Sequence, residues 1–401
     1  YDLANTIFSI NIVSNYFAVW VVDDMGGRDA HFSLATAAAT FLMLLTAPLL
    51  GALSDQLPRR LPLLAAATAT CCALTALLGV GGLAPSLVLF VGANYAFQAG
   101  LIVYDALLPV VSTEATRGRV SGLGVGIGYV GSLVGLGIGL AVMAAGGDEP
   151  LIFRLTAIAF ALFALPCFFW VREPPRPGAD WRNARLVRRS VADLRQTIGR
   201  LRRYPDLVRF LTGRVFYADA ANTLIAYMGI YAVLELGFSD TEKDALLIAG
   251  VLAAIVGGLL WGRVVDRIGP KRALSYVLVL WAVTLGLTAA AGLFGLPHAL
   301  FWPTAALAGL SLGCTWTTDR PFLLRLAPPR HLGQVYGLYA ISGRFAAIFG
   351  QLLWAFTVDV LGWGRPAAIL GLLLMVGISA VVLRPVGDLP RDWGSDERAP
   401  T

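Results

Sequence analysis

Long apolar runs alternate with short polar segments along almost the whole chain. Most runs reach about 20 residues, the length that an α-helix needs to cross a hydrocarbon core about 30 Å thick. The pattern predicts an all-α membrane protein that crosses the bilayer twelve times. The expected spans are residues 1–22, 33–54, 61–82, 86–108, 120–144, 151–171, 208–234, 244–264, 272–294, 299–324, 333–360 and 364–384.

The composition agrees with a membrane protein. Of the 401 residues, 57% are hydrophobic and only 14% are charged, and the mean hydropathy is +0.71. Soluble domains carry about 25% charged residues, so an ordinary soluble fold is excluded. The four cysteines and three histidines lack the spacing of metal ligands, and we expect no metal and no cofactor.

The net charge of +6 is compatible with binding of nucleic acid or of an anionic membrane surface, and the positions of the basic residues distinguish the two. If the first span runs outward from the cytoplasm, 25 of the 31 Lys and Arg residues, Arg320 among them, fall in cytoplasmic segments. Such an excess is typical of cytoplasmic loops, so the charge indicates orientation and lipid contact, and not nucleic acid binding. We expect a monomer in a bacterial inner membrane with both termini in the cytoplasm.

One long polar segment, residues 172–207, separates the sixth and seventh spans. Five apolar residues recur in it at helical spacing, among several arginines: Val187, Val191, Leu194, Ile198 and Leu201. This pattern predicts an amphipathic helix in the cytoplasmic interface of the membrane, and a solvated linker helix is the alternative. The segment divides the chain into bundles at 1–171 and 208–386, and a cytoplasmic tail follows at 387–401.

Short motifs recur in the same order in the two bundles, at offsets between 211 and 217 residues. The four pairs are Asp2-Leu-Ala-Asn5-Thr6 with Asp219-Ala-Ala-Asn222-Thr223, Asp55 with Asp266, Asp105 with Asp319, and Val120-Ser-Gly122 with Val335-Tyr-Gly337. They indicate a duplicated six-helix unit, the architecture of alternating-access carriers. The repeat also predicts that the first span begins about ten residues before Tyr1, so that Asp2 lies within the membrane.

The loops after the second and eighth spans resemble the signature of the major facilitator superfamily. Their sequences are Gly51-Ala-Leu-Ser-Asp55-Gln-Leu-Pro-Arg59-Arg60 and Gly262-Arg-Val-Val-Asp266-Arg267-Ile-Gly-Pro-Lys271-Arg272, and the first departs from the signature at Gln56 and Pro58. Three further motifs resemble the vacuolar amino-acid-effluxer-like, autophagy-related branch: Tyr1-Asp2-Leu-Ala-Asn5-Thr6, Tyr104-Asp105-Ala-Leu-Leu-Pro109 and Arg117-Gly-Arg119-Val-Ser-Gly122-Leu-Gly124.

The resemblance implies twelve transmembrane helices in two pseudo-symmetric six-helix bundles. It also implies a cavity lined by the first, fourth, seventh and tenth spans, and amino acids or similar zwitterions as substrates. A charged side chain inside a span costs about 2.5–3.5 kcal/mol by insertion scales, so each one is a candidate for function. The expected solute-binding residues are Asp2, Asn5, Tyr16, Asn94, Gln98, Tyr104, Asp105, Asp219, Asn222, Tyr227, Trp316, Asp319 and Arg344.

Structural roles stay open for several of these residues. The pairs formed by Asp2 with Asn5 and by Asp219 with Asn222 could instead hydrogen-bond neighbouring helices. Asp105 and Asp319 could pair with cytoplasmic arginines as a gate. Arg344 needs an anion in the low dielectric of the membrane, and either Asp319 or a substrate carboxylate would serve.

Charged residues at the cytoplasmic ends of the second and eighth spans are expected to form a gate. Asp55 and Asp266 each end a span beside basic residues, where a charge network or a neighbouring helix N-terminus could stabilise one conformation. The expected gating residues are Asp55, Arg59, Arg60, Asp266, Arg267, Lys271 and Arg272. The fifth span carries glycines at short spacings, which let another helix pack closely: Gly122, Gly124, Gly128, Gly131, Gly135 and Gly139.

The sequence favours a transporter over other classes of membrane protein. A membrane enzyme would need a nucleophile–base pair or a metal site at membrane depth, and the sequence offers neither. A receptor or scaffold would have little reason to keep paired carboxylates in both halves. We expect secondary active transport of a small polar or zwitterionic solute, with amino acid efflux and proton coupling as hypotheses. Multidrug, lipid and sugar transport and a non-transporting receptor are the alternatives.

Overall fold

The computed structural model describes residues 1–177, 186–200 and 203–388, and helices account for most of this part of the chain. The first span is a succession of α1 (Asp2–Phe8), the π-helix η1 (Ser9–Asn15), α2 (Tyr16–Val19) and the π-helix η2 (Trp20–Asp24). The next five are α3 (Asp29–Gln56), α4 (Leu61–Ala76), α5 (Leu83–Asp105), α7 (Arg117–Ala144) and α8 (Glu149–Trp170), with the short helix α6 (Leu108–Val111) after α5.

Six further spans follow the linker. They are α10 (Pro205–Leu234), α11 (Asp240–Ile268), α12 (Pro270–Phe294), α13 (His298–Leu326), α14 (Leu332–Ala355) with its continuation η5 (Phe356–Val360), and α15 (Arg365–Leu383). A 3-10 turn, η4 (Pro329–His331), precedes α14. Each of the twelve predicted spans therefore matches one helical segment, and the all-α, twelve-helix prediction is confirmed.

Nine helices of the described chain are long and apolar enough to cross a membrane by themselves. Among the others, α4 is apolar but has only 16 residues. The helices α10 and α13 are long, and they carry Arg214, Asp219, Asp319 and Arg320 in their inner turns. Since such residues are costly against lipid, α10 and α13 must direct them toward other helices or toward water.

The helices pack as two groups of six. In the first, α1, α3, α4, α5, α7 and α8 contact one another, and in the second the spans from α10 to α15 do so. The largest apolar core lies in the second group and reaches across to Met43, Ala47, Ala99 and Ile102 of the first. The two groups meet where α3 packs on α14 and where α7 packs on α11, which are equivalent pairs in the repeat.

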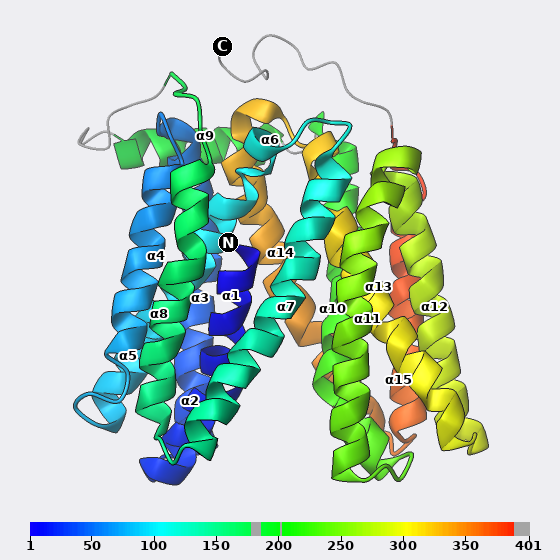
Figure 1. The fold of residues 1–401 in the computed structure, drawn as a ribbon. Coiled ribbons are helices and arrows are strands. Elements are labelled where there is room, and N and C mark those ends of the chain that lie inside the picture. The colour runs from blue at the N-terminus through cyan, green and yellow to red at the C-terminus, as the bar shows by residue number, and fades with distance from the viewer. Residues whose placement is uncertain (178–185, 201–202, 389–401) are drawn as a thin grey trace.

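The linker helix α9 (Leu186–Arg200) lies across one end of the bundle (Figure 1), which we call the α9 end. It packs against α3, and the Gln56 amide donates a hydrogen bond to Asp193. Arg188, Arg189 and Arg195 are exposed, while Val191 and Leu194 are partly buried. The expected helix is therefore present. Of the other residues named for it, the side chains of Val187 and Ile198 and the whole of Leu201 lie outside the described residues, as does the tail from 389 onward.

The two groups diverge away from the α9 end. In Figure 1 the ribbons of α3, α7, α11 and α14 converge near that end, and α7 leans away from α10 and α11 toward the other. A sharp turn at Gly269 (φ 85°) joins α11 to α12 at the α9 end, where a left-handed backbone favours glycine and the following Pro270 starts a helix.

Candidate functional site

Charged side chains from both halves meet at Arg320 on α13. Its guanidinium lies 3.4 Å from an oxygen of Asp2 on α1 and 3.5 Å from an oxygen of Asp105 on α5. The Tyr104 hydroxyl donates a hydrogen bond of 2.7 Å to the other Asp2 oxygen. These three charged side chains are between 14% and 18% exposed. One cation of the second half therefore bridges two carboxylates of the first.

The position of Arg320 corrects the sequence analysis, which counts it among the cytoplasmic residues. It lies within α13, six residues before the helix ends at Leu326, and it is an ion-pair partner of two predicted site residues. The sequence does indicate an intramembrane position for Arg320, because the residue lies inside the predicted tenth span, directly after Asp319.

A second cluster surrounds Asp319, which is completely buried. The Arg214 guanidinium on α10 lies 3.0 Å from one carboxylate oxygen, and Tyr339 donates to the same oxygen at 3.1 Å. Tyr217 donates to the other oxygen. Arg214 also covers the Tyr339 ring, 3.6 Å from its centroid, and donates to Ser342 at 3.0 Å. The carboxylate thus has one cation and two hydroxyl donors of its own.

Arg214 and Arg320 each pair with a carboxylate, and Arg344 on α14 differs from them. The described residues give it no ion-pair partner, and its neighbour Gly343 lies against Arg214, whose Nη1 would be 2.9 Å from a Cβ at that position. Of the two counter-ions that the sequence leaves open for Arg344, the structure assigns Asp319 to Arg214 instead.

The predicted residues of α10 mainly join helices. Asp219 is buried and accepts hydrogen bonds from the Gly350 amide of α14 at 2.6 Å and from Thr223 at 3.4 Å. Tyr227 stacks on Trp354 of α14 with ring centroids 4.5 Å apart. Asn222 is partly exposed. For Asp219 this geometry favours the interhelical role that the sequence leaves open.

Among the predicted polar residues of the first half, some contact other residues and one, Asn5, has no side-chain partner in the described structure. Gln98 donates to Asn94 at 3.0 Å, and both side chains are buried. Tyr16 packs against Gly139 of α7. Asn5 is only 5% exposed, and neither its amide oxygen nor its amide nitrogen has a hydrogen-bond partner in the described structure.

A cavity of about 300 Å³ opens between α1, η1, α5, α7 and α13. Its lining residues are Asp2, Asn5, Thr6, Ser9, Phe97, Leu101, Gly124, Val125, Gly128, Tyr129, Trp316 and Arg320. It brings together Asp2, Asn5 and Trp316 of the predicted set. Tyr104 and Asp105 line a smaller pocket of about 50 Å³ that shares Asp2 and Arg320 with the cavity. Phe97 and Tyr129 line the cavity but are absent from the predicted set, because nothing in the sequence distinguishes them from the other aromatic residues of the spans.

The α9 end is closed by two contacts at equivalent positions of the repeat. Asp55, near the end of α3, accepts hydrogen bonds from the backbone N–H groups of Gly333 at 2.8 Å and Gln334 at 3.0 Å, in the first turn of α14. Asp266, near the end of α11, accepts hydrogen bonds from the backbone N–H groups of Gly118 at 2.6 Å and Arg119 at 3.1 Å, in the first turn of α7. A helix N-terminus carries partial positive charge, so each carboxylate stabilises a junction between the halves.

Glycines allow the helices to approach at these junctions. A Cβ at Gly118 would lie 2.7 Å from an Asp266 carboxylate oxygen and 2.8 Å from the Val265 Cβ. A Cβ at Gly262 would lie 2.9 Å from the Cα of Arg119. Since such distances are far below van der Waals contact, neither position admits a larger residue without separating α7 from α11.

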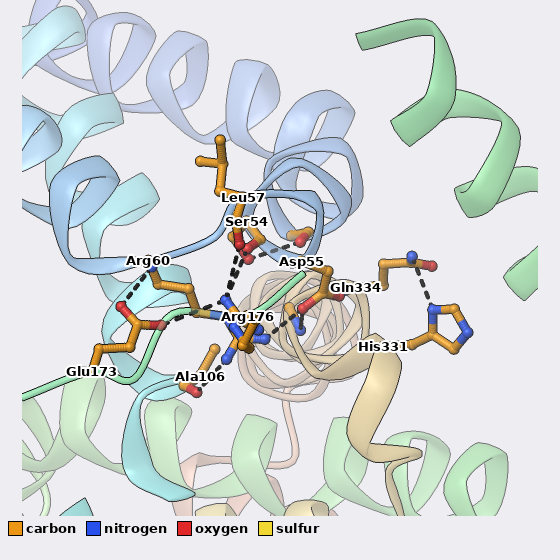
Figure 2. A network of polar contacts seen from close by, with 11 residues as sticks. Ser54, Asp55, Leu57, Arg60, Ala106, Glu173, Arg176, His331 and Gln334 are labelled. Atoms are coloured by element: carbon orange, nitrogen blue, oxygen red, sulfur yellow. Dashed lines mark hydrogen bonds and ion pairs between the residues drawn. The ribbon is translucent and has the colours of Figure 1, made fainter. Parts of the chain in front are cut away.

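A polar network connects the Asp55 junction to the start of the linker (Figure 2). Arg60 pairs with Asp55 at 2.5 Å and donates to the Ala106 carbonyl at 3.2 Å. Glu173 accepts the backbone N–H groups of Arg60 at 2.6 Å and Leu61 at 2.9 Å, and so caps α4. The segment after α8 is thereby bonded to the start of α4 and, through Arg60, to Asp55 at the end of α3.

Arg176 adds to this attachment. Its side chain reaches the Ser54 and Leu57 carbonyls, both at 3.4 Å, as Figure 2 shows. Burial lowers the pKa of the Arg176 guanidinium, and the nearby charge of Arg60 lowers it further. The three carbonyl and carboxylate acceptors around it, Glu173 included, favour the charged form.

The other predicted gating residues take no part in the two junctions. Arg59, Arg267 and Arg272 are exposed and have no ion-pair partner in the part of the chain described. Lys271 donates to the Leu383 carbonyl, and its backbone N–H reaches Asp388 at 3.3 Å, so it fastens α12 to the end of α15. Among the described residues no group of three His, Cys, Asp or Glu side chains is arranged to hold a metal ion.

The chain matches a known family over most of its length and resembles individual relatives. Residues 28–388 match the family described as "Vacuole effluxer Atg22 like". The MFS-type transporter YxiO of Bacillus subtilis is 26% identical over 412 residues, which cover 96% of this chain and 92% of that protein. Autophagy-related protein 22-1 of Penicillium rubens is 24% identical over 302 residues, or 68% of this chain and 50% of that protein.

Solved structures confirm the fold. The human organic anion transporter MFSD10 superposes with a TM-score of 0.71 at 16% identity, over 95% of this chain and 96% of that one. The major facilitator transporter FucP in its outward conformation gives a TM-score of 0.68 at 14% identity, over 97% and 98% of the two chains. The resemblance noted in the sequence motifs is thus confirmed. The chain is a multi-pass membrane protein that belongs to the Atg22-like family of major facilitator superfamily transporters.

Proposed function

We propose that this protein is a secondary active transporter of a small zwitterionic solute, an amino acid in the simplest case, and that it works by alternating access. One observation carries the proposal: the Asp2–Arg320–Asp105 ion bridge joins the two halves beside a cavity inside the bundle. Charges are kept at membrane depth where they face a solvated path or a substrate, and a zwitterion presents both complementary charges.

The closed α9 end supports an outward-facing state. On the predicted orientation this end is cytoplasmic, in a bacterial inner membrane with both termini inside. The Asp55 and Asp266 junctions then block the cytoplasmic side while the halves diverge on the other. Export is the direction favoured by the family description, which names vacuole effluxers. The bundles at 1–171 and 208–386 would move against each other, joined by the linker at 172–207.

Protons are the proposed coupling ion. Asp2 and Asp105 share one guanidinium, so protonating one of them leaves an ion pair intact. In the described structure Asp319 is the one carboxylate paired with Arg214, so protonating Asp319 would remove that ion pair altogether. Of the repeat pair Asp105 and Asp319, Asp105 is therefore the better candidate for the proton carrier. The proposed transporter is a monomer surrounded by membrane lipids.

Counterflow in proteoliposomes tests this function. Purified protein would be reconstituted and supplied with a panel of labelled amino acids, a sugar and an organic cation, with and without a pH gradient. We expect at least one amino acid to accumulate, and to accumulate more with the gradient. Transport of the sugar or the organic cation alone would contradict the zwitterion proposal.

The coupling is tested with Asp105→Asn and Asp319→Asn. We expect Asp105→Asn to lose the pH-driven accumulation and to keep counterflow, because exchange of solute needs no net proton movement. Asp319→Asn tests whether the Asp319 carboxylate also takes part in proton coupling. If both variants accumulate solute like the original protein, neither residue carries the proton.

A further inference from the structure

A groove on the outer side of the second half lies between α12 and α15. These two helices pack on each other, and their main contacts are with other helices of the same half. Figure 1 shows α12 at the edge of the molecule, away from the first half. Val279 on α12 is 61% exposed and Leu374 on α15 is 66% exposed, so large apolar side chains cover this face. On a membrane-spanning bundle such a face contacts lipid.

The groove is apolar along most of its length and basic at one end. Its volume is about 400 Å³. Between Ala282 on α12 and Leu373 on α15 its walls consist of aliphatic residues and one glycine. Lys271 and Ser275 line it where α12 begins, and Arg384 lines it directly after α15 ends, so these polar residues lie at the α9 end. The described lining residues include no Asp or Glu.

The carboxylates near the basic end have arginine partners of their own. Asp388 and Asp206 both act electrostatically on Lys271. Arg325 pairs with Asp388 at 3.2 Å, and Arg209 pairs with Asp206 at 3.3 Å. These two carboxylates are therefore neutralised by cations that do not line the groove.

The two cations of the groove remain available. Lys271 donates to the Leu383 carbonyl, which is a neutral acceptor, and Arg384 is exposed. No ion pair joins the side chain of Lys271 or of Arg384 to a carboxylate in the described part of the chain. Their positive charges can therefore bind an anion, and phosphate oxygens are strong acceptors for both kinds of cation.

The length of the groove matches one leaflet of a bilayer. From Lys271 to Ala282 the helix rises by about 16 Å, at about 1.5 Å per residue. Half of a hydrocarbon core about 30 Å thick is about 15 Å. The groove therefore extends from the headgroup level at the α9 end to near the middle of the membrane, as an acyl chain does.

We propose that this groove binds one anionic glycerophospholipid from the leaflet at the α9 end. The phosphate binds Lys271 and Arg384, and one acyl chain lies between α12 and α15 against Leu278 and Leu373. On the predicted orientation this leaflet is cytoplasmic, and its anionic lipids attract basic residues at the membrane surface. The site is separate from the cavity that holds the transported solute, so it does not depend on what that solute is.

A pair of lipids and a free anion test the headgroup and the chain. Phosphatidylglycerol and phosphatidylcholine with identical acyl chains would be titrated onto the purified protein in detergent, and bound lipids counted by native mass spectrometry. We expect the first phosphatidylglycerol to bind about fivefold more tightly or better, because phosphatidylcholine has no net charge. Equal affinity for the two lipids overturns the proposal. Displacement of the lipid by glycerophosphate at equal concentration would show a phosphate site without a chain site, and overturns it too.

Three variants assign the contacts. Lys271→Gln and Arg384→Gln each remove one cation and should weaken phosphatidylglycerol binding about fivefold. Gly377→Leu puts a side chain into the groove, at a position where a Cβ meets nothing within 4 Å, and should weaken binding of both lipids. If Lys271→Gln fails to fold because its bond to Leu383 is lost, the other two variants and the lipid pair still decide the question.

Two matched controls lie outside the groove. Arg263→Gln removes an exposed arginine near the α9 end of α11, and Gly286→Leu adds a leucine on α12 where a Cβ also meets nothing within 4 Å. Neither should change lipid binding. A loss in Arg263→Gln equal to that in Arg384→Gln would show general surface attraction and overturn the site. A dimer that Gly377→Leu dissociates would show that a second copy of the chain occupies the groove, with the same consequence.

Discussion

A carboxylate inside a membrane bundle needs a cation or hydrogen-bond donors, and Asp319 and Asp105 obtain them differently. Asp319 is bonded by Arg214, Tyr217 and Tyr339. Asp105 shares Arg320 with a second carboxylate and is partly exposed. The first arrangement is complete and favours a structural role, whereas the second has an unbalanced charge that a ligand or proton can use.

Arg214→Met tests the structural role of the Asp319 cluster. Removing one partner of a buried ion pair costs about 3–5 kcal/mol, because the other charge stays buried without compensation. We expect a clearly lower Tm for the detergent-solubilised protein. Adding Asp319→Asn should recover most of the loss, since the amide is neutral and still accepts from the tyrosines.

The control is Arg209→Met on the same helix. Arg209 is about half exposed and pairs with Asp206 at 3.3 Å, so its loss should cost at most about 1 kcal/mol. A double variant as unstable as Arg214→Met would show that the methionine, and not the unpaired carboxylate, causes the damage.

At the scale of single elements, the glycines of α7 determine how closely the neighbouring helices approach it. Its glycines contact α11 and α1, and Gly122 also lies against Thr317 of α13. Gly118 and Gly122 lie against α11, and Gly131 and Gly135 lie against α1. The sequence predicts one close partner for this glycine pattern, and the structure shows more than one, because the glycines occupy more than one face of the helix.

Gly118→Ala tests the contact with α11. The added methyl group would overlap Asp266 and Val265, so we expect α7 and α11 to separate at the α9 end. Spin labels on Glu114→Cys and Arg272→Cys, both exposed, would report a longer distance, in a background without the four native cysteines. Gly137→Ala on the same helix meets nothing within 4 Å and should leave the distance unchanged. An unchanged distance in Gly118→Ala would show that the junction tolerates the methyl group.

At the scale of the whole molecule, two equivalent junctions hold one end closed. Each places a carboxylate of one half on a helix N-terminus of the other, Asp55 on α14 and Asp266 on α7. Arg60 and Arg119 pair with these carboxylates from the first half. Because the junctions are separate in space, their free energies should add.

Asp55→Asn and Asp266→Asn test this additivity. A carboxylate at a helix N-terminus contributes about 0.3–1 kcal/mol, and up to about 2 in partly buried sites. At about 0.3–1 kcal/mol each, both changes together should shift the population toward the state open at the α9 end by about three- to thirtyfold, and by more where partial burial raises each contribution. The same spin-label pair measures the two populations. Asp359→Asn, exposed on η5, is the control. A double variant with the original distribution would exclude these contacts as determinants of the conformation.

The sequence by itself determined the spans, their order and the duplication. Hydropathy over some 20 residues is a local property of the chain, and a duplicated unit leaves matching motifs at a constant offset. For the same reason it identified Asp2, Asn5, Asp105 and Asp319 as groups held inside the membrane. It also indicated that Asp55 and Asp266 end their helices in equivalent positions.

Only the tertiary structure decided which of these groups meet. Successive residues of an α-helix point about 100° apart, so the neighbours Asp319 and Arg320 face different helices. Asp319 turns to Arg214 of its own half, and Arg320 turns to Asp2 and Asp105 of the other. Asp219 bonds a backbone amide, which no side-chain pattern reveals. The rotation and tilt of each helix fix such choices, and they follow from packing between segments distant in the chain.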